Sequence, residues 1–339
     1  MRSAMLPAVI ALLGLTATSA PAQNAAPSMT EAATAFLALL DEDDARQAMM
    51  PFDGDERFNF HFTPVPRKGL TLKDMSLDQR RAVHALLRSG LSSRGYLKAT
   101  SVMQLENILR QIEEPGWTRD RALYYVSIFG TPLEDEPWGW RLEGHHLSLN
   151  YTSVSDALTV TTPAFYGSNP AEVRTGPTAG LRVLGAEEDL ARHLVSLLNA
   201  EQRRLAVINE AAPRDIITGN DRSAQLEGYE GLAAAEMTTE QKEALWRLIR
   251  EYTGNQQPEL AEQYLEKVER AGIESFYFAW AGGLDRGDQH YYRVHGPMLL
   301  IEYDNTQGDG NHVHSVLRDL ENDFGGDLLR RHYEEHTHD

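Results

Sequence analysis

The sequence predicts an α+β fold in which helices cover paired antiparallel strands. Segments with helical periodicity cluster apart from segments that alternate like strands, without the strand–helix–strand rhythm of a parallel sheet. A second observation is an internal echo, in which two distant stretches share aromatic, Arg, Gly and Tyr positions. The chain has 339 residues and no cysteine, so its fold must depend on a hydrophobic core without disulfides.

The internal echo relates residues 140–151 to residues 292–303. Both stretches begin with an aromatic residue and Arg, have Gly at the fifth position and end on Tyr. An apolar strand precedes each, and a helix with a similar opening lies further upstream. Such ordered similarity predicts two pseudo-equivalent halves, residues 23–185 and 186–339, with a ligand site where they meet. Convergent amphipathic patterns could produce part of the similarity.

The first 22 residues have the pattern of a secretory signal peptide. Arg2 supplies a positive charge, an apolar run follows, and Ala20 and Ala22 form a small-residue cleavage site. No later apolar run is long enough to span a membrane. We therefore expect a secreted or periplasmic protein without membrane insertion. The formal net charge of -18 argues against nucleic acid as a partner.

Hydrophobic periodicity, together with the Gly, Pro and capping residues at which elements begin or end, predicts the helices and strands in order. Ser76 is expected to cap a helix that Gly90 ends, and the Pro and Gly residues of 163–185 indicate a long loop. The expected helices cover residues 30–50, 76–88, 98–112, 186–209, 239–252 and 258–271. The expected strands cover residues 57–62, 123–129, 139–151, 157–162, 274–280 and 290–303.

Histidines near the C-terminus make a metal site the leading hypothesis. His312 and His314 form a His-x-His pair, and residues two apart on a strand share a face and can bind one ion. Asn311 could instead cap a helix through Arg318, which would place the pair in its first turn. The alternative without metal is a polar cap and a buried, hydrogen-bonded imidazole.

A second histidine pair, His145 and His146, lies far upstream after Gly144. Adjacent residues on a strand point to opposite faces, so only one of the two is expected to reach a shared ion unless a bulge intervenes. The other is expected to lie in the core or to orient a neighbouring ligand through its ring N–H.

Carboxylates and arginines complete the candidate site. Asp319 and Glu302 are candidate catalytic residues, because a carboxylate often joins histidines in catalytic zinc and iron sites. Asp304 is expected either to shape a turn at the end of its strand or to belong to the metal site. Arg141 and Arg293 occupy matching places in the echo and could bind an anionic substrate. Buried ion pairs with Glu143 or Glu302 are the preferred alternative for both arginines.

Residues 332–336 match the H-x-x-E-H pattern of one class of zinc peptidases. The match lies at the extreme C-terminus, where no sequence remains for a downstream glutamate ligand. Terminal histidines are usually solvated, so the peptidase interpretation is weak.

Five segments that span the mature chain form a recognisable pattern: residues 67–92, 144–150, 291–297, 302–319 and 323–333. In these segments the chain resembles the exported domain-of-unknown-function 3500 family. The resemblance implies a family identity and no activity, so the motif residues must be interpreted by their chemistry.

These observations predict an exported metal-dependent enzyme, most simply a hydrolase of a small molecule. Zinc is the expected ion, with iron or copper as alternatives. A metal-dependent oxidoreductase and a non-catalytic protein that binds a small ligand or metal are the other candidates. The sequence lacks a G-x-S-x-G motif, a Walker loop and G-x-G-x-x-G, which argues against serine hydrolases and nucleotide cofactors. The oligomeric state stays open.

Overall fold

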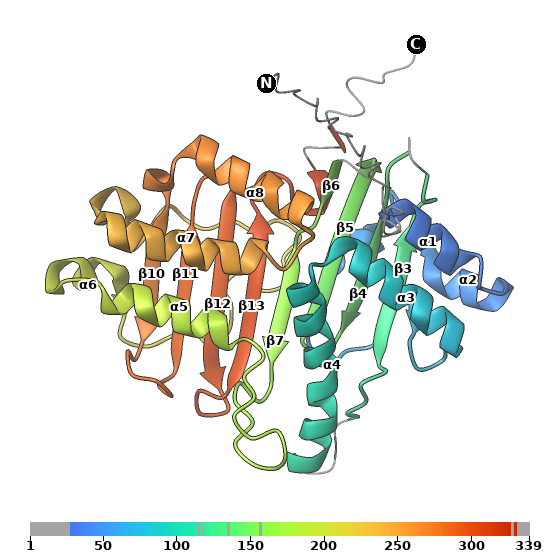
Figure 1. Cartoon of the computed structure of the whole chain (residues 1–339), viewed down its shortest axis with the longest axis horizontal. Helices are drawn as coiled ribbons and strands as arrows, with labels where there is room; N and C mark the ends of the chain where they lie inside the picture. The colour runs from blue at the N-terminus through green and yellow to red at the C-terminus, as the bar shows by residue number, and fades with distance from the viewer. Residues whose placement is uncertain are drawn as a thin grey trace, which may run out of the picture.

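The computed structural model describes residues 28–113, 116, 118–133, 136–155, 158–326 and 329–330. The signal peptide expected over residues 1–22 and the H-x-x-E-H match at residues 332–336 lie outside these ranges. Within them the fold is mixed α+β, as the sequence predicted, with helices packed on a sheet whose pairings are mostly antiparallel (Figure 1).

Thirteen strands of the described chain form one continuous sheet. They are β1 (Met49–Met50), β2 (Leu70–Thr71), β3 (Tyr124–Phe129), β4 (Trp138–Gly144), β5 (Leu147–Ser155), β6 (Leu158–Val160), β7 (Ala164–Ser168), β8 (Val207–Asn209), β9 (Leu232–Ala233), β10 (Tyr277–Gly282), β11 (His290–His295), β12 (Leu299–Gln307) and β13 (His312–Asp319). The main order is β1-β3-β4-β5-β7-β13-β12-β11-β10-β8, while β2, β6 and β9 pair with β3, β5 and β10. The antiparallel pairing of β7 with β13 therefore joins the two sides of the sheet.

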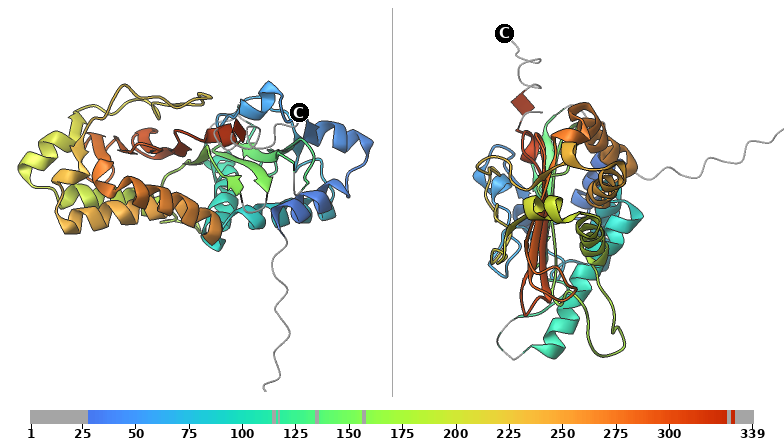
Figure 2. Two further views of the ribbon diagram at one scale, coloured as in Figure 1. Left: turned by 90° about the horizontal axis from the view of Figure 1, so that it is seen from above. Right: turned by 90° about the vertical axis from the view of Figure 1, so that its left-hand side faces the viewer.

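Most of the helices lie on one face of this sheet (Figure 2). The helices of the described chain are α1 (Met29–Leu37), α2 (Glu42–Ala48), α3 (Leu77–Gly90), α4 (Ser93–Ile112), α5 (Gly185–Ser196), α6 (Ala200–Ala206), α7 (Thr239–Thr253) and α8 (Pro258–Ala271). Side-chain caps fix several starts: Ser76 and Gln79 form a capping box at α3, and Thr238 and Gln241 form one at α7.

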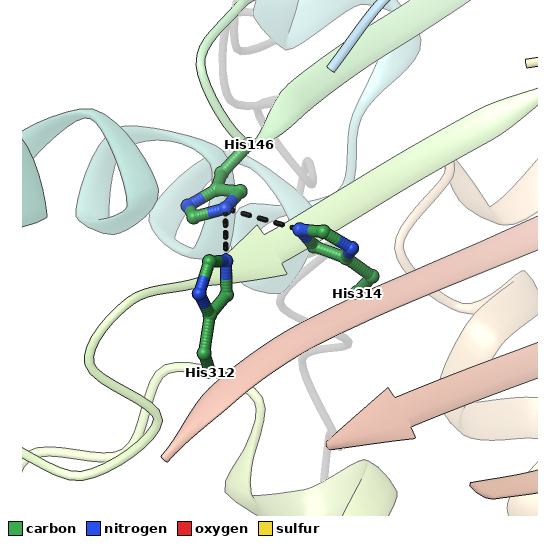
Figure 3. Close-up of side chains that lie close together, drawn as sticks. All are labelled: His146, His312 and His314. Atoms are coloured by element: carbon green, nitrogen blue, oxygen red, sulfur yellow. Dashed lines mark hydrogen bonds between the residues drawn. The ribbon is translucent and has the colours of Figure 1, made fainter. Parts of the chain in front are cut away.

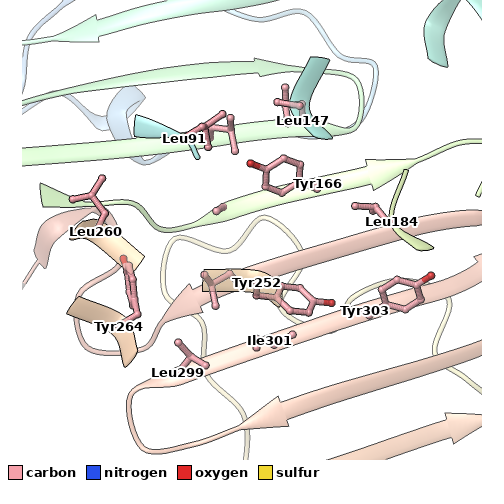
Figure 4. Close-up of a cluster of buried hydrophobic side chains, with 14 of the residues drawn as sticks. Leu91, Leu147, Tyr166, Leu184, Tyr252, Leu260, Tyr264, Leu299, Ile301 and Tyr303 are labelled. Atoms are coloured by element: carbon pink, nitrogen blue, oxygen red, sulfur yellow. The ribbon is translucent and has the colours of Figure 1, made fainter. Parts of the chain in front are cut away.

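The main hydrophobic core fills the space between the helices and the sheet, and it is continuous across the β7–β13 pairing (Figure 4). Tyr166 of β7 and Tyr303 of β12 are buried there, beside Tyr252 of α7. The Tyr252 hydroxyl accepts a hydrogen bond of 3.0 Å from Ser315 of β13, so odd-numbered residues of β13 face the helices.

Two long segments, residues 51–69 and 210–231, cover the opposite face of the sheet (Figure 2). Below them lies a second, smaller core, which consists of Phe60, Phe62, Phe165, Ile216, Val316 and Phe324. Even-numbered residues of β13 point into this side. The sheet is thus buried on both faces, and its central strands carry buried polar residues as well as apolar ones.

The structure corrects several predicted elements. The strand expected at 57–62 is a 3-10 helix, η1 (Asp55–Phe58), followed by irregular chain, because it belongs to a covering segment. The helices expected at 30–50 and 186–209 are each two helices with a short strand after the second. The strands expected at 139–151 and 290–303 are hairpins, and Asn311 precedes a strand and not a helix.

The largest correction is β7, which lies within the loop expected at 163–185. Pro163 and Pro170 lie on either side of its five residues, and prolines at such positions are typical of loops. All five are buried, because β5 and β13 pair with the strand on its two sides. None of the described helices is both long and apolar enough to cross a membrane.

Gly95 of α4 provides a test of the helix layer. A Cβ at this position would collide with the backbone carbonyl of Asn255, which leads into α8. We expect Gly95→Ala to lower the free energy of unfolding by about 1–3 kcal/mol, as overpacked sites do, measured by urea denaturation. Gly326→Ala is the control, because its added Cβ would meet nothing within 4 Å. Equal stability of both variants would contradict this close packing.

Candidate metal centre

Three imidazoles converge at one end of the β7–β13 pairing (Figure 3). The His146 Nε2 atom lies 2.8 Å from His312 Nε2 and 3.2 Å from His314 Nε2. A tetrahedral zinc ion with Zn–N bonds of about 2.0 Å holds its nitrogens about 3.3 Å apart. The three ring nitrogens are therefore gathered at nearly the spacing that one ion requires, and together they form a group that could hold a metal.

A tight turn places His146 in this group. His145 and His146 form the two-residue turn between β4 and β5, and the φ of His146 is 62°. The backbone N–H of His146 donates to Phe62, and its carbonyl accepts from Gly167. Gly167 also leaves room for the ring, because a Cβ there would lie 2.8 Å from His146 Cδ2.

The other two histidines come from β13, on which residues two apart share a face. His312 begins the strand and His314 follows on the side covered by residues 51–69 and 210–231. The His-x-His pattern thus acts on a strand, which is the first of the two geometries that the sequence left open. The rings of Phe62 and Phe165 lie 5.2 Å and 5.6 Å from that of His314 and bury it.

Asp215 fixes the tautomer of His314. Its Oδ1 lies 2.7 Å from His314 Nδ1, and because a carboxylate only accepts, the Nδ1–H group of His314 donates this hydrogen bond. The Nε2 of His314 consequently presents a lone pair toward His146 and His312. Carboxylate–histidine pairs of this kind orient metal ligands in many proteins.

Burial favours the neutral form of His146 and His312. It lowers the pKa of His146 well below its ordinary value, and the neighbouring His145, His312 and His314 lower it further. Burial, with His314 nearby, lowers the pKa of His312 to about 3. Neutral imidazoles offer the lone pairs that a metal ion needs, so the charge state of these two histidines suits a cation.

A second group extends from the other side of His314. Asp215, Asp304 and His314 also lie close enough to share a metal ion. Asp304, on β12, is fully buried, and burial raises the pKa of its carboxyl to about 7. Both of its oxygens accept from the Thr306 hydroxyl at 3.0 Å. The sequence left open whether Asp304 shapes a turn or belongs to the site. In the structure it lies opposite His314 in the pairing of β12 with β13.

His145 lies beside His146 but is not part of the group of three histidines that could hold a metal ion. Its ring stacks on that of His146 at 3.8 Å, while its Nδ1 atom is 2.5 Å from Glu106 of α4 and 2.9 Å from Arg119. Burial lowers the pKa of His145, against the opposing effect of Glu106. Of the two adjacent histidines, the structure thus brings His146 to the group and holds His145 against a carboxylate.

The two predicted catalytic carboxylates lie elsewhere. Asp319 ends β13, five residues and about 16 Å from His314 along the strand, where it accepts from Lys267 and from the backbone of Asn322. Glu302 is buried on β12, and its carboxylate accepts from the backbone N–H groups of Ile217 and Thr218. Glu302 therefore anchors the segment that carries Asp215.

Arg141 and Arg293 are buried in ion pairs and not directed at the histidines. Arg141 donates to the carbonyls of Glu56 and Asn59 and pairs with the carboxylates of Glu56 and Glu143. Arg293 pairs with Glu230. Each arginine thus holds one of the two covering segments on the sheet. The pair of Arg141 with Glu143 is one that the sequence suggested, whereas the partner of Arg293 is the exposed Glu230 in place of Glu302.

Sequence reasoning missed Asp215 and Glu106. Asp215 lies in an irregular segment without periodicity, and Glu106 belongs to an amphipathic helix on which its carboxylate resembles any solvated charge. Neither position carries a local signal, because each meets its histidine only through tertiary contact.

Comparison with known proteins gives a family and no characterised relative. The family model described as "Protein of unknown function (DUF3500)" matches residues 22–326. No curated protein and no solved structure matches the chain.

The contact between Asp215 and His314 yields a prediction about metal affinity. Asp215→Asn weakens the acceptor that fixes His314, so we expect zinc affinity to fall about 10- to 100-fold, as for other residues that orient metal ligands. Competition with a chromophoric chelator measures it. Asp221→Asn, at an exposed position of the same segment, should leave affinity unchanged. Equal affinities of the two variants would exclude this role of Asp215.

Proposed function

The chain belongs to the DUF3500 family of proteins of unknown function, and we propose that it is an exported metal-dependent hydrolase of a small molecule. The observation that carries the proposal is the convergence of three Nε2 atoms, from His146, His312 and His314. Catalytic zinc sites commonly have three protein ligands and keep a fourth position open for water or substrate.

The proposed chemistry assigns a task to each residue. When bound in a site of three neutral histidines, zinc lowers the pKa of bound water to about 7 and polarises a carbonyl group. His146, His312 and His314 would hold the ion, and Asp215 would keep His314 in the tautomer that binds it. Asp304 lies opposite His314 in the pairing of β12 with β13 and would serve as a proton acceptor beside the ion. Asp319 and Glu302 have no place in this scheme, because their carboxylates accept from other groups.

Iron or copper in the same site would support oxidative chemistry instead. Imidazole ligands suit zinc, copper and iron alike, so the donor set alone does not choose among them. The metal that the protein carries when isolated therefore decides between a hydrolase and an oxidoreductase.

Export is part of the proposal. The first 22 residues carry the sequence pattern of a secretory signal peptide, with cleavage after Ala22. The expected location is the periplasm or the exterior of the cell. The expected partner is a small molecule, since a formal net charge of -18 disfavours nucleic acid.

We also propose that the two sides of the sheet descend from one duplicated unit. On one side Trp140 pairs with Tyr151, and their rings stack at 4.2 Å; on the other Tyr292 pairs with Tyr303, and their rings stack at 4.9 Å. Both outer strands β3 and β10 carry a short parallel strand and a short antiparallel one. Residues 23–185 and 186–339 would then be the repeats, with the metal site where they meet.

An experimental structure tests the duplication. Superposition of β3–β5 on β10–β12 should place Arg141 on Arg293 and Tyr151 on Tyr303. A shift of one residue along any strand would reverse the facing of its side chains and reject the common origin.

Metal content is the first test of the proposed function. We expect the mature chain, purified without a histidine tag, to carry close to one zinc ion, measured by elemental mass spectrometry. The His312→Ala/His314→Ala double variant should lose it, while His193→Ala, at an exposed position of α5, should retain it. A folded wild-type chain that binds no metal, even after reconstitution, would end the metalloenzyme proposal.

Hydrolysis is the second test. A panel of small esters, amides and lactones should include substrates that the zinc-loaded protein cleaves and the chelated protein does not. Activity should return on adding zinc and should be absent in the double variant. If the chain instead carries stoichiometric iron or copper and cleaves none of the panel, the hydrolase assignment is replaced by an oxidative one.

A further inference from the structure

A cavity of about 500 Å³ lies next to the metal centre. Its wall includes apolar and aromatic groups, from Val65, Pro66 and Tyr125, and the polar side chains of Glu106 and His145. Pockets that bind small molecules typically have volumes of about 300–1,000 Å³ and mix apolar walls with a few polar groups. The cavity thus has the size and lining of a site for a small organic molecule.

His145 connects the cavity to the three histidines. Its side chain contributes to the cavity wall, and its ring stacks on the ring of His146 with centroids 3.8 Å apart. The Tyr124 hydroxyl, also in the wall, donates to the His145 carbonyl at 2.8 Å and fixes this turn. A molecule that contacts His145 is therefore separated from a ligand of the proposed metal ion by a single imidazole.

The charge at the cavity is set by Glu106. This carboxylate is only 4 % exposed, and one of its oxygens meets His145 Nδ1 at 2.5 Å. Asp120 also lines the wall, but Lys73 lies 3.1 Å from its carboxylate and compensates its charge.

Two arginines lie at this site, and each has an acidic partner of its own. Arg67 lies 4.0 Å from Glu143. Arg119, which is 2.9 Å from His145, pairs with Glu113 at 2.6 Å. The cavity therefore favours a positive charge or a hydrogen-bond donor over an anion.

We propose that this cavity, beside the metal centre, is a binding site for a small ring-bearing molecule with a positive charge or a hydrogen-bond donor that meets Glu106. The ring would pack against the proline and tyrosine side chains of the wall. The connection of this site to the metal centre rests on the proposed function, while the pocket and its preference follow from the lining residues.

The test compares two probes of similar size and opposite charge. These are 2-phenylethylammonium and benzylsulfonate, whose sulfonate is a poor metal ligand. Ligand-observed NMR titrations of the full mature chain, with and without zinc, give the dissociation constants. We expect the ammonium probe to bind at least tenfold more tightly than the sulfonate. Glu106→Gln should weaken the ammonium probe about tenfold, as loss of a charged hydrogen bond does.

A second variant tests the location. Val65→Trp should fill the cavity and abolish binding of the ammonium probe, while Leu97→Trp, an equally large change at an exposed position of α4, should not. Elemental mass spectrometry of each variant reports the metal site separately. Two results would contradict the proposed pocket: tighter binding of benzylsulfonate than of the ammonium probe, or unchanged binding of the ammonium probe by a folded Val65→Trp variant.

The same measurements separate this proposal from the proposed function. A chain that holds zinc but does not bind the ammonium probe loses the pocket and keeps the metal site. A chain that binds the probe in the cavity but never holds a metal keeps the pocket and overturns its connection to a metal centre. Zinc retention together with Glu106-dependent binding of the ammonium probe supports both.

Discussion

The antiparallel pairing of β7 with β13 is the constraint on which the rest of the structure depends. It makes one sheet out of two sets of strands, and the main core continues across it. The same pairing sets His314 opposite Gly167, the residue whose missing Cβ leaves room for the His146 ring. Because side chains alternate along a strand, a slip of one residue would turn His312 and His314 toward the helices. Register between these two strands thus determines both the core and the convergence of the three imidazoles.

The two covering segments, residues 51–69 and 210–231, orient the histidines that the sheet carries. Residues 51–69 are held by Arg141 and bring Phe62 against His146 and His314. Residues 210–231 are held by Glu302 and Arg293 and bring Asp215 to His314. Buried charges of this kind cost desolvation free energy, which is offset only when each finds hydrogen bonds. The arginines and the glutamate that stand out in the sequence are therefore used to hold irregular chain in place next to the histidines.

Periodic elements could be predicted from the sequence, and elements defined by tertiary contact could not. The helix capped by Ser76 and the helix that begins at Pro258 follow from local caps and amphipathic patterns. The strand β7 could not be predicted, since five residues between prolines carry no period and become a strand only through two neighbours. Among site residues, the His-x-His spacing indicated His312 and His314, and the paired histidines indicated one of His145 and His146. Asp215 and Glu106 required the fold, because their partners lie 99 and 39 residues away along the chain.

The position of the three histidines has a thermodynamic consequence. His146 lies in the first half of the chain and His312 is 166 residues further on, so no ligand set exists until both halves have closed into one sheet. An ion bound there would act as a cross-link between them, and its binding free energy would add to the stability of the closed state alone. At a free metal concentration 1,000 times the dissociation constant this linkage amounts to about 4 kcal/mol. The association of the two halves would then depend on the availability of metal in the compartment where the protein resides.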